Sequence, residues 1–238
     1  MLNRFLVFAS APIVGFLLAG GALADEPLVR ESRPIANVTA VSLRNSGDLF
    51  ITQGDREELI VEAQKALLPK ILTEVEKGTL VLSMKPSAFH VGMDAKIKFY
   101  LTVKRLDKIA LSGSGDVRAV SLTADKLDIA TSGSGNVHID SLTAQEVTVR
   151  ISGSSDVKLA GKVSSQSIKI AGSGNYGAPE LKSGTTSVAI AGSGDAVLWA
   201  TDALSISIAG SGDVTYYGQP KIAQSVAGSG KVQGLGSK

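Results

Sequence analysis

The stretch Ser112–Val117 reads Ser-Gly-Ser-Gly-Asp-Val, and it decides the fold because the chain contains seven versions of it. The later versions begin at Ser132, Ser152, Ala171, Ala191, Ala209 and Ala227, so successive starts lie 18 to 20 residues apart. A constant period of this length is typical of a solenoid, in which each coil buries its apolar face only against its neighbours. The repeat therefore predicts a stack of coils.

Between two glycine-rich phrases, each repeat alternates apolar and polar residues twice. In the second repeat the two runs are Val137–Ile139 and Val147–Val149, and a polar turn at Thr143–Gln145 separates them. Alternation with a period of two indicates half-buried strands. The pattern predicts a flattened parallel β-helix with two strands and two turns per coil. Coils stack at about 4.8 Å, so residues in the same slot lie above one another.

The glycine-rich phrase is expected to form the tight corner of each coil. Gly113 and Gly133 would permit positive φ angles and close backbone approach. The Asp or Asn that follows is expected to hydrogen-bond its own turn. Like charges stacked at this spacing repel by about 1 kcal/mol in water, and the neutral Asn residues relieve most of that. The residues in this slot are Asp116, Asn136, Asp156, Asn175, Asp195, Asp213 and Lys231.

The preceding part of the chain has a less regular strand pattern. Alternation is clear at Val38–Leu43, Asp48–Gln53 and Glu58–Ala63, and Asn45–Asp48 echoes the repeated phrase once. Further strand patterns occupy residues 72–76, 79–85 and 95–103. The sequence thus predicts four parts: a signal peptide (1–24), an extended or flexible leader (25–36), an N-terminal β region with irregular first rungs (37–105) and about seven regular coils (106–238).

The N-terminus has the features of a bacterial secretory signal. Arg4 precedes an apolar run over Phe5–Leu18, and Ala22 and Ala24 form a small-x-small cleavage site before Asp25. No later stretch is apolar enough to span a bilayer, so no membrane span is expected after cleavage. With no cysteine, the exported protein is expected to be stabilised by packing alone.

Charge and composition narrow the function classes. The whole chain has 24 basic and 22 acidic residues, a formal net charge of +2. This near-neutral balance gives no electrostatic basis for binding nucleic acid.

Two chemical alternatives to a plain scaffold are open. Some polysaccharide-degrading enzymes are parallel β-helices, but they need clustered carboxylates with a base or a metal. The two histidines, His90 and His138, are far apart in sequence, and His138 occupies an outward slot that Arg118 and Lys158 hold in adjacent repeats. Calcium-binding Gly-rich rolls have a nine-residue period, about half of the period found here. We therefore predict no catalytic residue, no metal site and no cofactor.

Two aromatic residues are the candidate binding site. Trp199 and Tyr217 hold the same outward slot in successive repeats, where earlier repeats have Val120, Asp140 and Ala160. Stacked exposed aromatic rings can contact a sugar ring or a protein partner. The alternative is that both rings pack under the C-terminal tail.

Several segments together resemble the bacterial head-GIN domain family, whose members are named autotransporter adhesins. These segments are Ile51–Asp55 (Ile-Thr-Gln-Gly-Asp), Gly78–Leu80 (Gly-Thr-Leu), Leu106 and Ile109–Val117. The resemblance covers roughly residues 37–234. It implies a secreted right-handed parallel β-helix that is related in shape to pectin lyases without their catalytic residues.

The expected function is non-enzymatic adhesion or partner binding in the cell envelope, either in the periplasm or at the cell surface. The expected partner is an envelope protein or a glycan. A polysaccharide-active enzyme and a calcium-ordered scaffold are the alternatives.

Overall fold

The structure is a computed structural model that describes residues 27–86 and 96–238. The predicted signal peptide, with Ala22 and Ala24, and also His90 lie outside the described residues.

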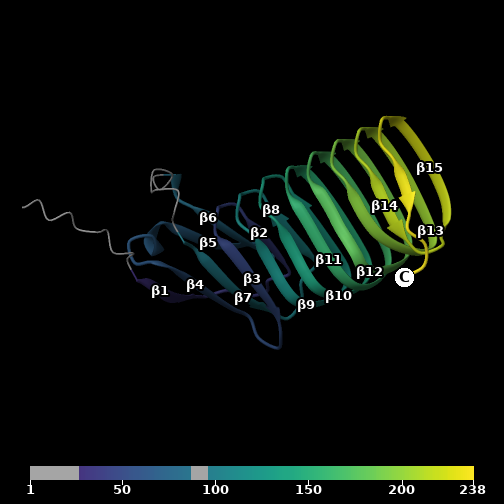
Figure 1. The fold of residues 1–238 in the computed structure, drawn as a ribbon. Coiled ribbons are helices and arrows are strands. Elements are labelled where there is room, and N and C mark those ends of the chain that lie inside the picture. Colours follow the sequence, from purple (N-terminus) through teal and green to yellow (C-terminus); the bar gives the residue numbers. More distant parts are fainter. Residues whose placement is uncertain (1–26, 87–95) are drawn as a thin grey trace, which may run out of the picture.

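Long parallel strands stacked side by side make up most of the molecule (Figure 1). Each strand from β9 to β13 is one coil, and each pairs in parallel with the coil before it. The predicted all-β parallel β-helix is confirmed, and the described residues include no α-helix. These strands are β9 (Val117–Thr131), β10 (Val137–Gly153), β11 (Asp156–Gly172), β12 (Asn175–Gly192) and β13 (Ala196–Gly210).

The next coil is split between β14 (Val214–Tyr217) and β15 (Lys221–Gly228), and β16 (Val232–Gly234) follows. The solenoid therefore has about six turns, because seven corner phrases enclose six complete coils.

Each coil is one continuous strand rather than the two separate strands that the sequence predicts. The ladder between β9 and β10 runs from Val117↔Val137 to Thr131↔Ile151 and skips only Val120/Asp140 and Asp125/Gln145. The polar residues between the two apolar runs do bend the backbone. Their amides and carbonyls still pair with the neighbouring coil, so the bend does not interrupt the strand.

The first rungs belong to the same solenoid. The first half of β9 pairs in parallel with β3 (Asp48–Gln53), and its second half pairs in parallel with β8 (Lys108–Leu111). The sheet then continues on one side through β7 (Lys98–Val103), β4 (Glu58–Gln64) and β1 (Leu28–Arg33). We call this side the first sheet. The second sheet continues from β8 through β2 (Ala40–Leu43), β6 (Thr79–Met84) and β5 (Ile71–Glu76).

The N-terminal segment that was expected to be an extended or flexible leader contains an ordered strand. Residues of β1 pair antiparallel with β4, from Leu28↔Gln64 to Arg33↔Leu59. Sequence alone did not identify this pairing, because five of the six residues of β1 are exposed and lack an alternating apolar pattern. Between β4 and β5, Pro69 lies in a short 3-10 helix at Leu68–Lys70.

The interior is filled by apolar side chains, with one buried polar network. The Tyr176 hydroxyl donates to Gln166 Oε1 at 2.5 Å, and Gln166 Nε2 donates to Ser183 Oγ at 2.8 Å. Ser183 Oγ in turn lies 2.8 Å from the backbone carbonyl oxygen of Trp199. The register between β12 and β13 shifts at this point, with Lys182 opposite Trp199. We infer that the network satisfies a carbonyl that the shift removes from the ladder.

The corner glycines are needed chiefly because consecutive coils lie very close together. A Cβ atom on Gly133 would lie 2.1 Å from the carbonyl oxygen of Gly113. The expected positive φ does not occur at Gly113 or Gly133, and it appears only in later corners such as Gly192, where φ is 140°. At Gly133 the requirement is therefore steric, not conformational.

Candidate functional site

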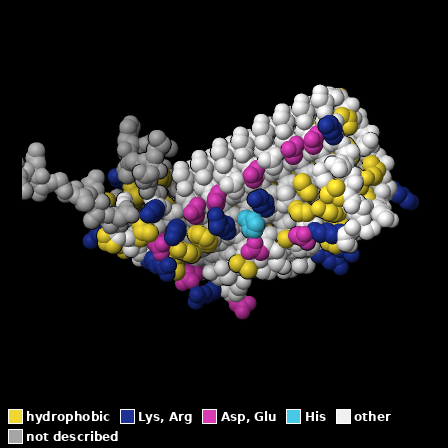
Figure 2. Space-filling model, in the orientation of Figure 1, with side chains coloured by type: hydrophobic (Ala, Val, Ile, Leu, Met, Phe, Trp, Pro, Cys, Tyr) yellow, Lys and Arg dark blue, Asp and Glu magenta, His cyan; other side chains and the backbone are white. Residues whose placement is uncertain are grey.

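The Asp and Asn residues after the glycines form one continuous line along the solenoid axis, which we call the Asx row. In Figure 2 its acidic side chains cross the coils in a line. The row begins at Asp48 in the irregular first rungs, because the Asp116 backbone N–H donates to Asp48 Oδ1 at 3.3 Å. It continues through Asp116, Asn136, Asp156, Asn175, Asp195 and Asp213, and Lys231 follows.

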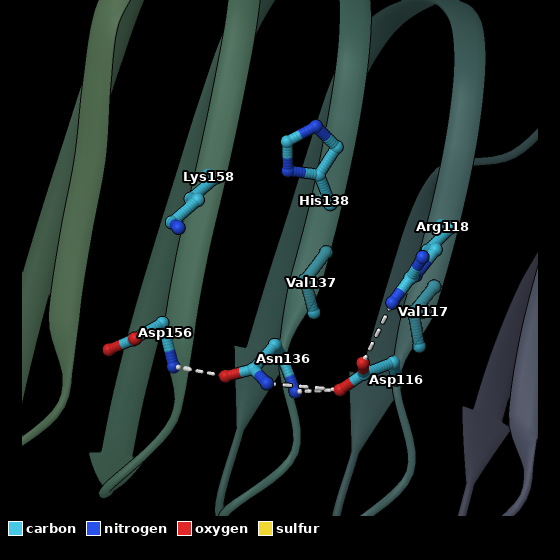
Figure 3. A pocket seen from close by; sticks show the side chains of 8 residues that line it. All are labelled: Asp116, Val117, Arg118, Asn136, Val137, His138, Asp156 and Lys158. Atoms are coloured by element: carbon cyan, nitrogen blue, oxygen red, sulfur yellow. Dashed lines mark hydrogen bonds and ion pairs between the residues drawn. The ribbon is translucent and has the colours of Figure 1, made fainter.

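The Asx side chains bind the next coil and not their own turn, contrary to expectation. Asp116 Oδ1 accepts from the backbone N–H of Asn136 at 3.1 Å, and Asn136 Oδ1 accepts from that of Asp156 at 3.1 Å (Figure 3). Further along, Asp213 Oδ1 accepts from the N–H of Lys231 at 2.7 Å. The corner points these backbone N–H groups along the solenoid axis. The acceptor within reach is therefore the Asx side chain of the preceding coil.

A second line of polar residues lies beside the Asx row. Arg118, His138 and Lys158 are directly opposite one another in the ladders of β9, β10 and β11, and we call them the basic row. Together with Asp116, Asn136, Asp156 and the adjacent Val117 and Val137, they line a shallow groove of about 340 Å³ (Figure 3). The predicted outward slot is thus confirmed for all three residues.

The groove presents hydrogen-bond donors and acceptors side by side. Arg118 Nη2 donates to Asp116 Oδ2 at 3.3 Å, and His138 Nε2 lies 2.6 Å from Asp140 Oδ1. Within residues 27–86 and 96–238, the Lys158 ammonium group forms no ion pair. This mixture suits a ligand rich in hydroxyl groups, which donate and accept hydrogen bonds at once.

Trp199 and Tyr217, the aromatic pair, are neighbours as the sequence predicts. They lie directly opposite one another in the ladder between β13 and β14, at the C-terminal end of the outer face of the first sheet. Figure 2 shows hydrophobic side chains gathered there. Both side chains are half-buried. The Lys238 ammonium group lies 5.6 Å from the ring centroid of Trp199 and 4.9 Å from that of Tyr217.

Lys238 also donates to the Pro179 carbonyl oxygen at 2.8 Å and forms an ion pair with Glu180. The C-terminal tail therefore packs on the aromatic pair, as the alternative expectation stated, and leaves part of both rings accessible.

Sequence reasoning missed a second pair of aromatic rings on the same face. Phe50 lies opposite Arg118 in the ladder between β3 and β9, and Tyr100 of β7 stacks on it with centroids 5.3 Å apart and an angle of 17° between the rings. Both residues occupy outward positions of alternating strands, which was the available signal. The groove is thus flanked by aromatic rings on both sides along the axis.

The described residues contain no group of three or more His, Cys, Asp or Glu side chains that could hold a metal ion. His138 contacts one carboxylate, Asp140, at the exposed surface. No helix in the described part of the chain is long and apolar enough to cross a membrane.

Comparison with known families gives a match over most of the chain. The model of the family described as "Putative auto-transporter adhesin, head GIN domain" matches residues 37–220. The chain belongs to this family. The resemblance drawn from Ile109–Val117 and the other segments is confirmed. The family description names an adhesin and not an enzyme, and it suggests an exported or surface protein. The comparison with curated proteins finds no match.

Solved structures of similar proteins share the fold. A "putative adhesin" from Bacteroides fragilis NCTC 9343 is 28% identical, with a TM-score of 0.84, and the match covers 89% of this chain and 98% of that chain. A "Putative lipid binding protein" from Parabacteroides distasonis ATCC 8503 is 24% identical, with a TM-score of 0.70 and coverage of 88% and 97%. A "putative adhesin" from Parabacteroides merdae ATCC 43184 is 20% identical, with a TM-score of 0.70 and coverage of 88% and 96%.

Proposed function

We propose that this head-GIN protein is an exported, non-enzymatic adhesion module that binds an extended envelope glycan along the first sheet. The observation that carries the proposal is the groove of the Asx row and the basic row, flanked by aromatic rings at both ends. Successive coils present the same slots in register, so weak contacts can repeat along a polymer. From Phe50 to Trp199 the outer face of the first sheet spans five strand spacings, about 24 Å.

The groove residues have separable roles in this proposal. Arg118, His138 and Lys158 donate hydrogen bonds to sugar hydroxyl groups, and Asp116 and Asp156 accept them. The aromatic pair provides flat apolar faces on which a sugar ring can stack. Asn136 is the neutral residue that separates the carboxylates of Asp116 and Asp156.

Binding can be followed directly, because Trp199 is the single tryptophan of the chain. Purified protein would be screened against immobilised envelope polysaccharides, and hits would be titrated by tryptophan fluorescence and calorimetry. We expect a change in Trp199 emission on binding. Tyr217→Ser and the double variant with Trp199→Ser should weaken calorimetric binding, with a melting temperature within a few degrees of the parent.

A matched control is Lys169→Ala, an exposed substitution of β11 on the second sheet. It should leave binding unchanged. If the double aromatic variant binds as the parent does, the aromatic pair is not part of the site. Binding to an envelope protein and to no glycan would contradict the glycan assignment. Cleavage of uronic-acid polymers by the purified protein would overturn the non-enzymatic function.

A further inference from the structure

Both sheets of the solenoid end in strands that have one free edge. Among residues 27–86 and 96–238, the second sheet ends in β5, which pairs only with β6, and in β15, which pairs only with β13. A free edge exposes unpaired backbone N–H and C=O groups, which can pair with a strand of another chain. Proteins normally block such edges with short strands, inward-pointing charges or prolines.

The edges of the first sheet carry such blocking features. In β1, Glu31 and Arg33 lie opposite the buried residues Val61 and Leu59, and they form an ion pair of 3.0 Å. Two charged side chains therefore stand on the core-facing side of this edge. At the other end, β16 is only three residues long.

The edges of the second sheet lack inward charges. Val75 of β5 lies opposite the buried Leu80, and Ile222 of β15 lies opposite the buried Leu204, which fixes the core-facing side of each strand. Val75, Ile222 and Val226 are nevertheless 38%, 43% and 40% exposed. The core-facing positions are Ile71, Thr73 and Val75 in β5, and Ile222, Gln224 and Val226 in β15.

We propose that β15 of one copy pairs antiparallel with β5 of a second copy, so that copies join head to tail. The directions agree, because β15 runs parallel to the coils whereas β5 is antiparallel to β6, which runs parallel to β2. Side chains directly opposite in an antiparallel pair share one face of the sheet. A single register places Ile222 opposite Val75, Gln224 opposite Thr73, and Val226 opposite Ile71.

Charge favours this arrangement over a symmetric pairing of two β15 strands. The same register places Lys221 opposite Glu76, with Glu74 exposed nearby. In the part of the chain that the structure describes, none of these three side chains forms an ion pair. A symmetric antiparallel pair of β15 strands, with Ile222 opposite Val226, would instead place Lys221 opposite the uncharged Ala227 and so would lack this pair of opposite charges.

The contact joins two different surfaces, so it does not close on itself and generates an open chain of copies. β16 extends the first sheet one strand beyond β15, so consecutive copies should meet at an angle. Each added copy would repeat the outer face of the first sheet, which carries the Asx row and the basic row. Association of the copies does not depend on what that face binds.

Sedimentation velocity of the purified full chain tests the proposal. We expect the average mass to rise with protein concentration past that of a dimer, and to fall at high salt. Glu76→Lys and Lys221→Glu should each raise the dissociation constant about fivefold, because each places like charges opposite one another. The double variant should restore association.

Lys169→Glu, which changes charge in the middle of the solenoid, is the control and should leave the mass unchanged. Val226→Lys should abolish association by placing a charge on the core-facing side, and circular dichroism would verify that each variant folds. A protein that is monomeric at every concentration would overturn the proposal. So would a closed dimer, or association that is insensitive to Glu76→Lys.

Discussion

At the scale of single residues, two kinds of position hold the coils together. Corner residues such as Gly133 must be glycine, because the neighbouring backbone occupies the space of a Cβ. Tyr176 is fully buried and needs a partner for its hydroxyl, which Gln166 provides. Both positions depend on the adjacent coil, so both should be sensitive to substitution.

Gly133→Val should lower the free energy of unfolding by about 2 kcal/mol or more, because backbone must shift to admit the side chain. Thermal melting measures the effect, and Lys169→Ala, an exposed change, serves as the control. Equal melting temperatures for the two variants would show that the corner tolerates a Cβ.

Tyr176→Phe should cost about 1–3 kcal/mol, because Gln166 Oε1 loses its donor inside the core. Tyr216→Phe is the matched control, since the Tyr216 hydroxyl has no hydrogen-bond partner among the described residues. Denaturant unfolding of both variants would decide the point, and equal losses would contradict the role of the network.

Burial also makes Tyr176 a source of pH dependence. It raises the pKa of the Tyr176 phenol above its ordinary value of 10.0. The folded state then keeps the proton while the unfolded state loses it, so this contribution is complete below pH 10 and declines as the pH rises further. The decline approaches about 1.4 kcal/mol per pH unit. Tyr176→Phe should remove that part of the alkaline slope, and an unchanged slope would contradict it.

At the scale of elements, the coils are joined by backbone ladders and by the Asx row. The row runs from Asp48 to Asp213, so it links the irregular first rungs to the last complete coil. Its last acceptor is Asp213, whose Oδ1 accepts from the Lys231 backbone N–H. Neutral Asn136 separates Asp116 from Asp156, which keeps like charges apart.

Asn136→Asp should destabilise the protein at neutral pH, by about 1 kcal/mol from each neighbouring carboxylate at low salt. The loss should shrink at high salt, because mobile ions screen the repulsion between exposed carboxylates. Ser207→Asp adds the same charge on the second sheet, beside Ala189 and Ser225, and should have little effect. A salt-independent loss for Asn136→Asp would exclude repulsion as the cause.

At the scale of the whole molecule, the solenoid is a line of nearest-neighbour contacts. Interior coils are paired on both sides, whereas β1, β5, β15 and β16 are paired on one side within the described part of the chain. Stability in such an array falls toward its ends, because terminal units have one interface fewer.

Hydrogen exchange followed by mass spectrometry should therefore find the strongest protection in β10–β12 and weak protection in β15 and β16 at low protein concentration. Protection in β15 should rise with concentration if copies join through it. Uniform protection along the chain at low concentration would contradict the nearest-neighbour description.

The local sequence was sufficient to predict the coil, because the glycine phrase and the two-residue alternation repeat at a fixed period. Val117, Val137 and Val157 stack as their slots predict, and Trp199 meets Tyr217. Slot identity follows from counting residues, which needs no knowledge of distant contacts.

Only the tertiary structure decided what each corner residue contacts. The acceptor role of Asn136 toward Asp156, the steric need for Gly133 and the pairing of β1 with β4 all involve chain segments about 20 or more residues away. The groove likewise exists because the ladders bring Arg118, His138 and Lys158 together. Periodicity specifies which residues share a slot, whereas the direction of each N–H and the space beside each Cα depend on how the coils stack.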